Sequence, residues 1–138
     1  MEQTLMMIKP DAVARNLGGR ILARVEESGL RVIRLRMVHL RAEEARAFYR
    51  VHEGKPFLDA LVAFMSSGPI VVGVLEGEEA IRRWRDLMGA TDPAKAAVGT
   101  IRKDFAENIE RNSVHGSDAP ETAREEIAFH ALSLDLRG

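Results

Sequence analysis

The sequence contains no cysteine among its 138 residues. Disulfide frameworks, thiolate zinc sites and cysteine nucleophiles are therefore excluded, and the composition fits a reducing compartment. No apolar run approaches the roughly 18 residues that a membrane span needs. The amino terminus also lacks the basic segment and cleavage site of a signal peptide. We therefore expect a cytoplasmic protein.

The sequence also has no large excess of positive or of negative charge. The 20 Lys and Arg residues nearly balance the 21 Asp and Glu residues, which gives a net charge of −1. No overall basic field attracts nucleic acid or an anionic membrane, so any anion binding must come from local clusters. An apolar fraction of 46% with 30% charged residues excludes a disordered chain. The length, without repeats or linkers, predicts a single domain over residues 1–138.

Apolar periodicity places the secondary structure. Strands are expected at Thr4–Ile8, Leu30–Leu40, Ile70–Leu75 and, briefly, Asn112–Gly116. Helices are expected around Ile21–Val25, Ala42–Tyr49, Pro56–Met65 and Ala80–Met88, and after a capping box at Asp118–Glu121. Ile33, Leu35 and Met37 are expected on one face of the second strand. The consecutive apolar residues of the third strand predict a central position in the sheet. Residues 89–112 give mixed signals and no assignment. The alternation predicts an α+β or α/β sandwich.

Several familiar binding motifs are missing. The chain has no P-loop, no Gly-x-Gly-x-x-Gly after a strand and no His-Glu-x-x-His helix. A nucleotide, if one binds, must therefore be held by separate basic side chains. The sequence predicts no metal ion held by protein ligands alone.

His115 is the first candidate for chemistry. It lies at an expected strand-to-helix junction, where Gly116 permits unusual backbone geometry. A neutral imidazole nitrogen is a competent nucleophile near neutral pH. Ser117 and the Glu125–Glu126 pair are close enough in sequence to orient the ring. From spacing alone, a structural histidine beside a turn remains the alternative.

Six segments, taken together, favour the catalytic over the structural interpretation of His115. They are Ile8-Lys9-Pro10-Asp11, Lys55-Pro56-Phe57, Ser67-Gly68-Pro69, Gly89-Ala90-Thr91-Asp92-Pro93-Ala94, Gly99-Thr100-Ile101-Arg102 and Asn112-x-x-His115-Gly116-Ser117-Asp118. Their order and spacing resemble the nucleoside diphosphate kinase family, and the resemblance extends from Thr4 to about Phe129.

The resemblance implies an enzyme that moves the γ-phosphate of a nucleoside triphosphate to a nucleoside diphosphate by a ping-pong mechanism. His115 would carry the phosphate as a phosphohistidine. By the same resemblance, the phosphates and sugar would be bound by Lys9, Arg85, Thr91, Arg102 and Asn112, and Phe57 would stack on the base. The residues expected to support and orient the histidine are Tyr49, Ser117 and Glu126.

The resemblance further implies an α+β, ferredoxin-like α/β sandwich, in which helices on one face cover a four-stranded antiparallel sheet. Mg²⁺ would arrive with the nucleotide and bridge its phosphate oxygens. The chain would form a homo-oligomer, a tetramer or hexamer built from dimers. Two residues depart from the family pattern, Leu58 at a common Phe position and His130 at a usual aromatic position, which predicts altered packing near the base site. The short tail after Ala131 leaves the oligomer size open.

Two other functions compete with this prediction. A ferredoxin-like sheet can serve as a platform for single-stranded nucleic acid. The 5% aromatic content and the net charge of −1 argue against that use. A catalytically silent scaffold of the same family is the second alternative, although every expected site residue is present.

Overall fold

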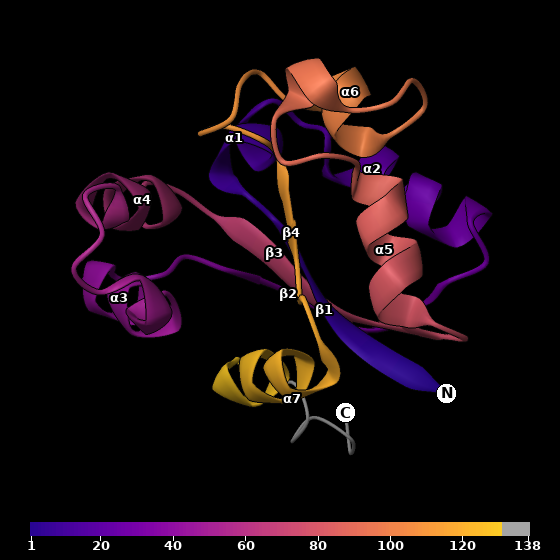
Figure 1. The fold of residues 1–138 in the computed structure, drawn as a ribbon, viewed down its shortest axis with the longest axis horizontal. Helices are drawn as coiled ribbons and strands as arrows, with labels where there is room; N and C mark the ends of the chain where they lie inside the picture. The colour runs from indigo at the N-terminus through magenta and orange to yellow at the C-terminus, as the bar shows by residue number, and fades with distance from the viewer. Residues whose placement is uncertain (131–138) are drawn as a thin grey trace.

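A computed structural model describes residues 1–130 (Figure 1). Within that part of the chain, no helix is both long and apolar enough to cross a membrane. The elements follow in the order β1 (Glu2–Ile8), α1 (Pro10–Ala14), α2 (Gly18–Glu27), β2 (Arg31–Val38), α3 (Ala42–Phe48), η1 (Arg50–His52), α4 (Leu58–Met65), β3 (Ile70–Gly77), α5 (Ala80–Met88), η2 (Pro93–Lys95), α6 (Ile101–Phe105), β4 (Val114–Gly116) and α7 (Pro120–Phe129).

The four strands form one antiparallel sheet in the order β2-β3-β1-β4. The predicted four-stranded α+β fold is therefore confirmed, and so is the central position of β3. Within residues 1–130, strand β4 lies at one edge of the sheet and pairs with β1 alone, where Met7 is opposite His115. The expected single domain over residues 1–138, and the tail after Ala131, extend beyond the described residues, so the domain boundaries stay a prediction.

Helices cover both faces of the sheet, as Figure 1 shows. Met6 and Ile8 of β1 pack into a core with α1, α2, α5 and α6. Leu5 and Met7 point the other way, into a core with α3, α4 and α7. The expectation of helices on one face alone was wrong. Because β1 and β3 are apolar at successive positions, both of their faces must be covered.

Strand β2 differs from its expected pattern because of a β-bulge. The register with β3 shifts between Val32 and Arg34. Ile33 therefore packs toward the core of α3, α4 and α7, while Leu35 and Met37 lie on the opposite face, 52% and 62% exposed. The prediction that these three side chains share one face was wrong, because one inserted residue reverses the alternation.

Two helix starts also differ from the sequence prediction. Helix α4 begins at Leu58, two residues after Pro56. Helix α7 has Ala119 at its N-cap and no capping hydrogen bond from a side chain. The predicted capping box is wrong because the Asp118 carboxylate accepts a hydrogen bond from Arg85 instead.

Candidate active site

Lys9 stands at the end of β1, directly before the proline that begins α1. Its side chain is buried, and its Nζ donates a hydrogen bond of 2.8 Å to Oδ1 of Asn112. Burial and the nearby Arg102 guanidinium lower the pKa of the Lys9 ammonium to about 8, against the opposite effect of Asp11. A cation held in this way is desolvated, so its interaction with an anion that binds beside it is favourable.

A cavity of about 470 Å³ opens beside Lys9. Its lining residues are Lys9, Phe57, Ala60, Leu61, Phe64, Thr91, Ile109, Glu110 and Asn112. Nδ2 of Asn112 donates to the backbone oxygen of Thr91 at 3.2 Å, which ties two walls together. Phe57, half-exposed at the start of α4, offers a flat apolar face. The cavity therefore suits a ligand with a planar ring and an anionic end.

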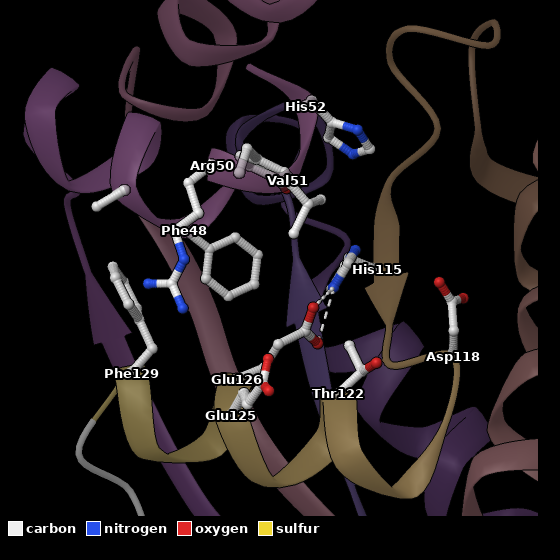
Figure 2. A pocket seen from close by; sticks show the side chains of 12 residues that line it. Phe48, Arg50, Val51, His52, His115, Asp118, Thr122, Glu125, Glu126 and Phe129 are labelled. Carbon is white, nitrogen blue, oxygen red and sulfur yellow. Dashed lines mark hydrogen bonds and ion pairs between the residues drawn. The ribbon is translucent and has the colours of Figure 1, made fainter.

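His115 lies on β4, and its ring points toward Glu126 of α7 (Figure 2). The Nε2 atom is 3.2 Å and 3.3 Å from the two oxygens of that carboxylate. Because an ionised carboxylate only accepts hydrogen bonds, Nε2 carries the proton. The lone pair then resides on Nδ1, which is the nitrogen available to attack an electrophile.

The Glu126 carboxylate is fixed by two donors, His115 and Ser117, whose Oγ donates to Oε1 at 2.7 Å. Burial alone would raise the pKa of the Glu126 carboxyl. The hydrogen bonds from His115 and Ser117 outweigh burial, so the pKa of Glu126 is lowered and the group stays ionised. A negative charge therefore stands behind the His115 ring.

A second cavity, of about 250 Å³, contains His115 and lies between η1 and α7 (Figure 2). Tyr49 lines it, with its ring centroid 6.3 Å from that of His115. The Tyr49 hydroxyl is buried and has no partner within residues 1–130. Burial and the charge of Glu126 raise the pKa of Tyr49. The hydroxyl therefore stays protonated.

Two arginines approach the same end of the sheet. Arg102 is buried and donates to the backbone oxygens of Gly89 and Val114, both at 2.9 Å. Burial and neighbouring Arg85 lower the pKa of Arg102 to about 10, which leaves it protonated at neutral pH. Arg85 is half-exposed and pairs with Asp118 at 2.5 Å. Arg102 is therefore held in place, whereas Arg85 has an exposed and replaceable partner.

The predicted site residues thus fall into three groups. Lys9, Phe57, Thr91 and Asn112 share the larger cavity, and Tyr49, His115 and Glu126 share the smaller one. Arg85, Arg102 and Ser117 line neither of these two cavities, although Asp118, the partner of Arg85, lines the smaller one. His52 and Phe48 line the smaller cavity as well, and neither was predicted as a site residue.

His52 connects the two cavities. It lines the His115 cavity, stacks on Tyr49 at 6.2 Å and meets the edge of Phe57 at 5.1 Å. Its only sequence signal is its position three residues after Tyr49, about one helical turn. That spacing is common in surface helices and carries no functional information on its own.

The two departures from the family pattern are both buried. Leu58 packs in the core with α3, away from the lining of the Lys9 cavity. His130 follows α7 and lies 5.2 Å from Phe48. Burial lowers the pKa of His130 to about 4, so its ring is neutral and behaves as an aromatic. Leu61 and Phe64, which line the Lys9 cavity, pack against the core that contains Leu58, so altered packing near the base site stays a prediction.

Residues 1–130 contain no group of three or more His, Asp or Glu side chains placed to hold a metal ion. The lining of the Lys9 cavity includes one carboxylate, that of Glu110. A magnesium ion that enters with phosphate oxygens and water as its main ligands is compatible with this donor set.

Comparison with known proteins agrees with this arrangement. A family model described as nucleoside diphosphate kinase matches residues 2–133. The chain is 61% identical over 129 residues to the nucleoside diphosphate kinase of Halorhodospira halophila, covering 94% of this chain and 92% of that relative. It is 59% identical over 136 residues to the enzyme of Syntrophotalea carbinolica, covering 99% of each.

Solved structures give the same result. The Aquifex aeolicus nucleoside diphosphate kinase superimposes with a TM-score of 0.91 at 44% identity and covers 94% of each chain. A halophilic nucleoside diphosphate kinase from Halobacterium salinarum, in complex with CDP, superimposes with a TM-score of 0.89 at 44% identity. That match covers 93% of this chain and 86% of the other.

Proposed function

Since the chain belongs to the nucleoside diphosphate kinase family, and so passes phosphate between nucleoside triphosphates and diphosphates, we propose that it works by a ping-pong mechanism through a phosphohistidine at His115. The observation that carries the proposal is the contact of Nε2 with the Glu126 carboxylate. It leaves Nδ1 as the nucleophile and supplies a counter-charge for the ring.

In the first half-reaction, the Nδ1 lone pair of His115 forms a bond to the γ-phosphorus. The bond from that phosphorus to the β,γ-bridging oxygen breaks, and the diphosphate leaves with its electron pair. The ring keeps its Nε2 proton and becomes cationic, and the ionised Glu126 stabilises that charge. In the second half-reaction an oxygen of another nucleoside diphosphate attacks the phosphorus, and the P–N bond breaks to restore the neutral ring.

The cations would stabilise the transition state. Phosphoryl transfer places negative charge on three equatorial oxygens, so catalysis depends on positioned positive charge. Lys9 and Arg102 are buried and already fixed by hydrogen bonds to their neighbours. Arg85 would join them by exchanging Asp118 for phosphate, because an exposed ion pair contributes only about 0–1 kcal/mol.

The Lys9 cavity would hold the nucleoside and its inner phosphates. Phe57 would stack on the base, with Thr91 and Asn112 donating to phosphate or sugar oxygens. Every base presents an aromatic face, so stacking predicts low base selectivity. The relative from Halobacterium salinarum was solved with CDP, which supports a nucleoside diphosphate in this cavity. Mg²⁺ would enter on the phosphates, where it neutralises charge on their oxygens.

We extend the proposal to assembly and location. An exposed strand edge with apolar side chains favours pairing with another chain. Leu35 and Met37 of β2 present such a surface beside a cavity that they share with α2. We assign this surface to a second copy of the chain in a homo-oligomer. Sedimentation of Met37→Glu should show smaller particles than wild type, and an unchanged size would assign the contact elsewhere. A cytoplasmic location stays a prediction.

Phosphate labelling tests the proposed mechanism. Incubation with ATP and Mg²⁺ should add one phosphate per chain that survives alkali and is lost in mild acid, as expected for a phosphohistidine. His115→Ala should abolish the label. His39→Ala is the matched control, because His39 is bonded to the Ser66 backbone oxygen in another part of the fold. A label retained in His115→Ala would contradict the assignment. Binding of single-stranded DNA with a steep salt dependence, without any phosphate transfer, would favour the nucleic-acid function.

A further inference from the structure

The ring of Phe48 is the meeting point of an aromatic cluster beside His115. Its centroid lies 5.6 Å from that of His115, with the two planes at 74°. On its other sides, Phe48 meets Tyr49 at 4.9 Å, Phe129 at 5.3 Å and His130 at 5.2 Å. Figure 2 shows the ring between the Phe129 side chain and the His115–Glu126 pair.

We propose that Phe48 is a positioning residue for phosphoryl transfer, which holds the His115 ring against Glu126 and covers one side of the bond between them. The inference rests on the proposed phosphohistidine mechanism. It assigns Phe48 no contact with the nucleotide, and its role is to act through the imidazole.

The Nε2 contact with Glu126 is the hydrogen bond that the His115 ring makes within the described residues. One hydrogen bond fixes one ring atom but leaves tilt of the ring open. The edge-to-face arrangement of Phe48 restricts that tilt, because aromatic pairs prefer this geometry. Nδ1 is thereby aimed in one direction before the substrate arrives.

Phe48 is the last residue of α3, whereas Phe129 and His130 lie at the end of α7, one turn beyond Glu126. Phe48 therefore joins the helix that carries the carboxylate to the ring that the carboxylate orients. The neutral, buried His130 ring completes this apolar packing.

The His115–Glu126 hydrogen bond is partly buried, and a hydrogen bond is stronger in a low local dielectric. A smaller side chain at position 48 would let water compete for Nε2 and for the carboxylate. The proton could then move to Nδ1 in a larger share of molecules, and that tautomer cannot attack phosphorus.

The variants Phe48→Leu and Phe48→Tyr test the proposal. Phe48→Leu should slow single-turnover phosphorylation of His115 by about 3- to 10-fold, the range that an aromatic pair supports. The Kd for ADP should not change, since Phe48 is absent from the lining of the Lys9 cavity. Nitrogen NMR of the imidazole should show a smaller share of the Nε2–H tautomer. Phe48→Tyr keeps the ring, so its phosphorylation rate and its share of the Nε2–H tautomer should both equal those of wild type.

Phe105→Leu is the matched control. Phe105 is a partly buried aromatic in the core on the opposite face of the sheet, so its loss should leave the His115 tautomer unchanged. Thermal unfolding is measured on each variant. Should Phe48→Leu fail to fold, Phe48→Met replaces it under the same expectation, because it keeps the volume without the ring.

The other outcomes separate the two proposals. An unchanged phosphorylation rate with an unchanged tautomer in Phe48→Leu overturns the role of Phe48. A weaker Kd for ADP that accounts for the whole loss also overturns it, because Phe48 would then be a binding residue. Absence of label on His115 in wild type overturns the proposed mechanism, while the tautomer measurement on the unphosphorylated chain still decides whether Phe48 positions the ring.

Discussion

The Oγ of Ser117 donates a hydrogen bond of 2.7 Å to the same Oε1 of Glu126 that faces Nε2 of His115. The carboxylate is therefore fixed from the β4 side by two donors, two residues apart in sequence. Ser117 therefore restrains the carboxylate that orients the imidazole.

Glu126→Gln should slow phosphorylation of His115 by about 10- to 100-fold, the usual loss when the carboxylate behind a functional histidine is removed. The amide can still accept a hydrogen bond, but it supplies no negative charge for the cationic ring. Rapid-quench labelling measures the rate. Glu121→Gln, at an exposed position in the first turn of the same helix, should leave the rate within about twofold. Equal losses of rate in both variants would show that the effect comes from a disturbed α7 and not from removal of the Glu126 charge.

The pKa of Lys9, about 8, predicts a pH limit on catalysis. Lys9 is cationic below that value and loses its proton as the pH rises through it, which removes positive charge from the phosphate site. The kcat/KM should therefore fall on the alkaline side with an apparent pKa near 8. Lys9→Arg should shift the fall to higher pH, because a guanidinium stays protonated. A flat profile from pH 7 to about 10 would contradict the assignment of Lys9 to phosphate.

The same group predicts an effect on stability. Lys9 has a lower pKa in the folded chain than its ordinary value of 10.5, so its buried charge opposes folding at neutral pH. Lys9→Met should raise the free energy of unfolding at pH 7 by roughly 1–2 kcal/mol, while it abolishes activity. Between pH 8 and 10.5 the unfolded wild type binds more protons, so wild type gains stability and the advantage of the variant shrinks. Urea unfolding at several pH values tests this prediction. A stability advantage of Lys9→Met that grows with pH would contradict it.

Arg102→Ala should slow phosphoryl transfer by about 10²-fold or more, because a positioned donor to the transition-state oxygens is lost. Its neighbour Lys103 is exposed, so Lys103→Ala is the control and should retain activity. Thermal unfolding must accompany the rates, since Arg102 also binds the backbone oxygens of Gly89 and Val114. A stable Arg102→Ala chain with wild-type rates would make this arginine purely structural.

Gly116→Ala should destabilise the chain by about 1–3 kcal/mol, as overpacking does in a filled core. A Cβ atom at this position would lie 2.5 Å from the Trp84 ring. Gly19→Ala is the opposite case, because this helical position has open space and alanine should stabilise it by about 0.5–1 kcal/mol. Calorimetry of the two variants compares them directly. Equal free energies of unfolding in the two variants would show that the Trp84 ring can shift to make room for the added Cβ atom.

The sequence predicted the long elements well because their apolar spacing is local. It did not predict α1 or α6, each of five residues, since a helix of that length shows barely one period. Thr100 caps α6 by accepting from the Lys103 N–H, but a lone threonine in an unassigned stretch is a weak signal. The bulge at Ile33 was missed because nothing in an alternating pattern marks an inserted residue.

The candidate site could be assembled from the sequence only through family resemblance. Lys9 and Asn112 are 103 residues apart, and no spacing rule joins them. The pairing of Arg85 with Asp118 also depends on where α5 and the start of α7 meet in space. The structure places these groups, while their roles in catalysis stay predictions for the variants above.

Strand β4 is three residues long and forms an outer edge of the sheet. Side chains anchor it where a second neighbouring strand would: Trp84 donates to the His115 backbone oxygen and Arg102 to that of Val114. The backbone that carries the imidazole is therefore held in place, and one side of the ring is left uncovered. Trp84 and Arg102 thus take the place of a paired strand on this side of β4 and hold the main chain from which the imidazole projects.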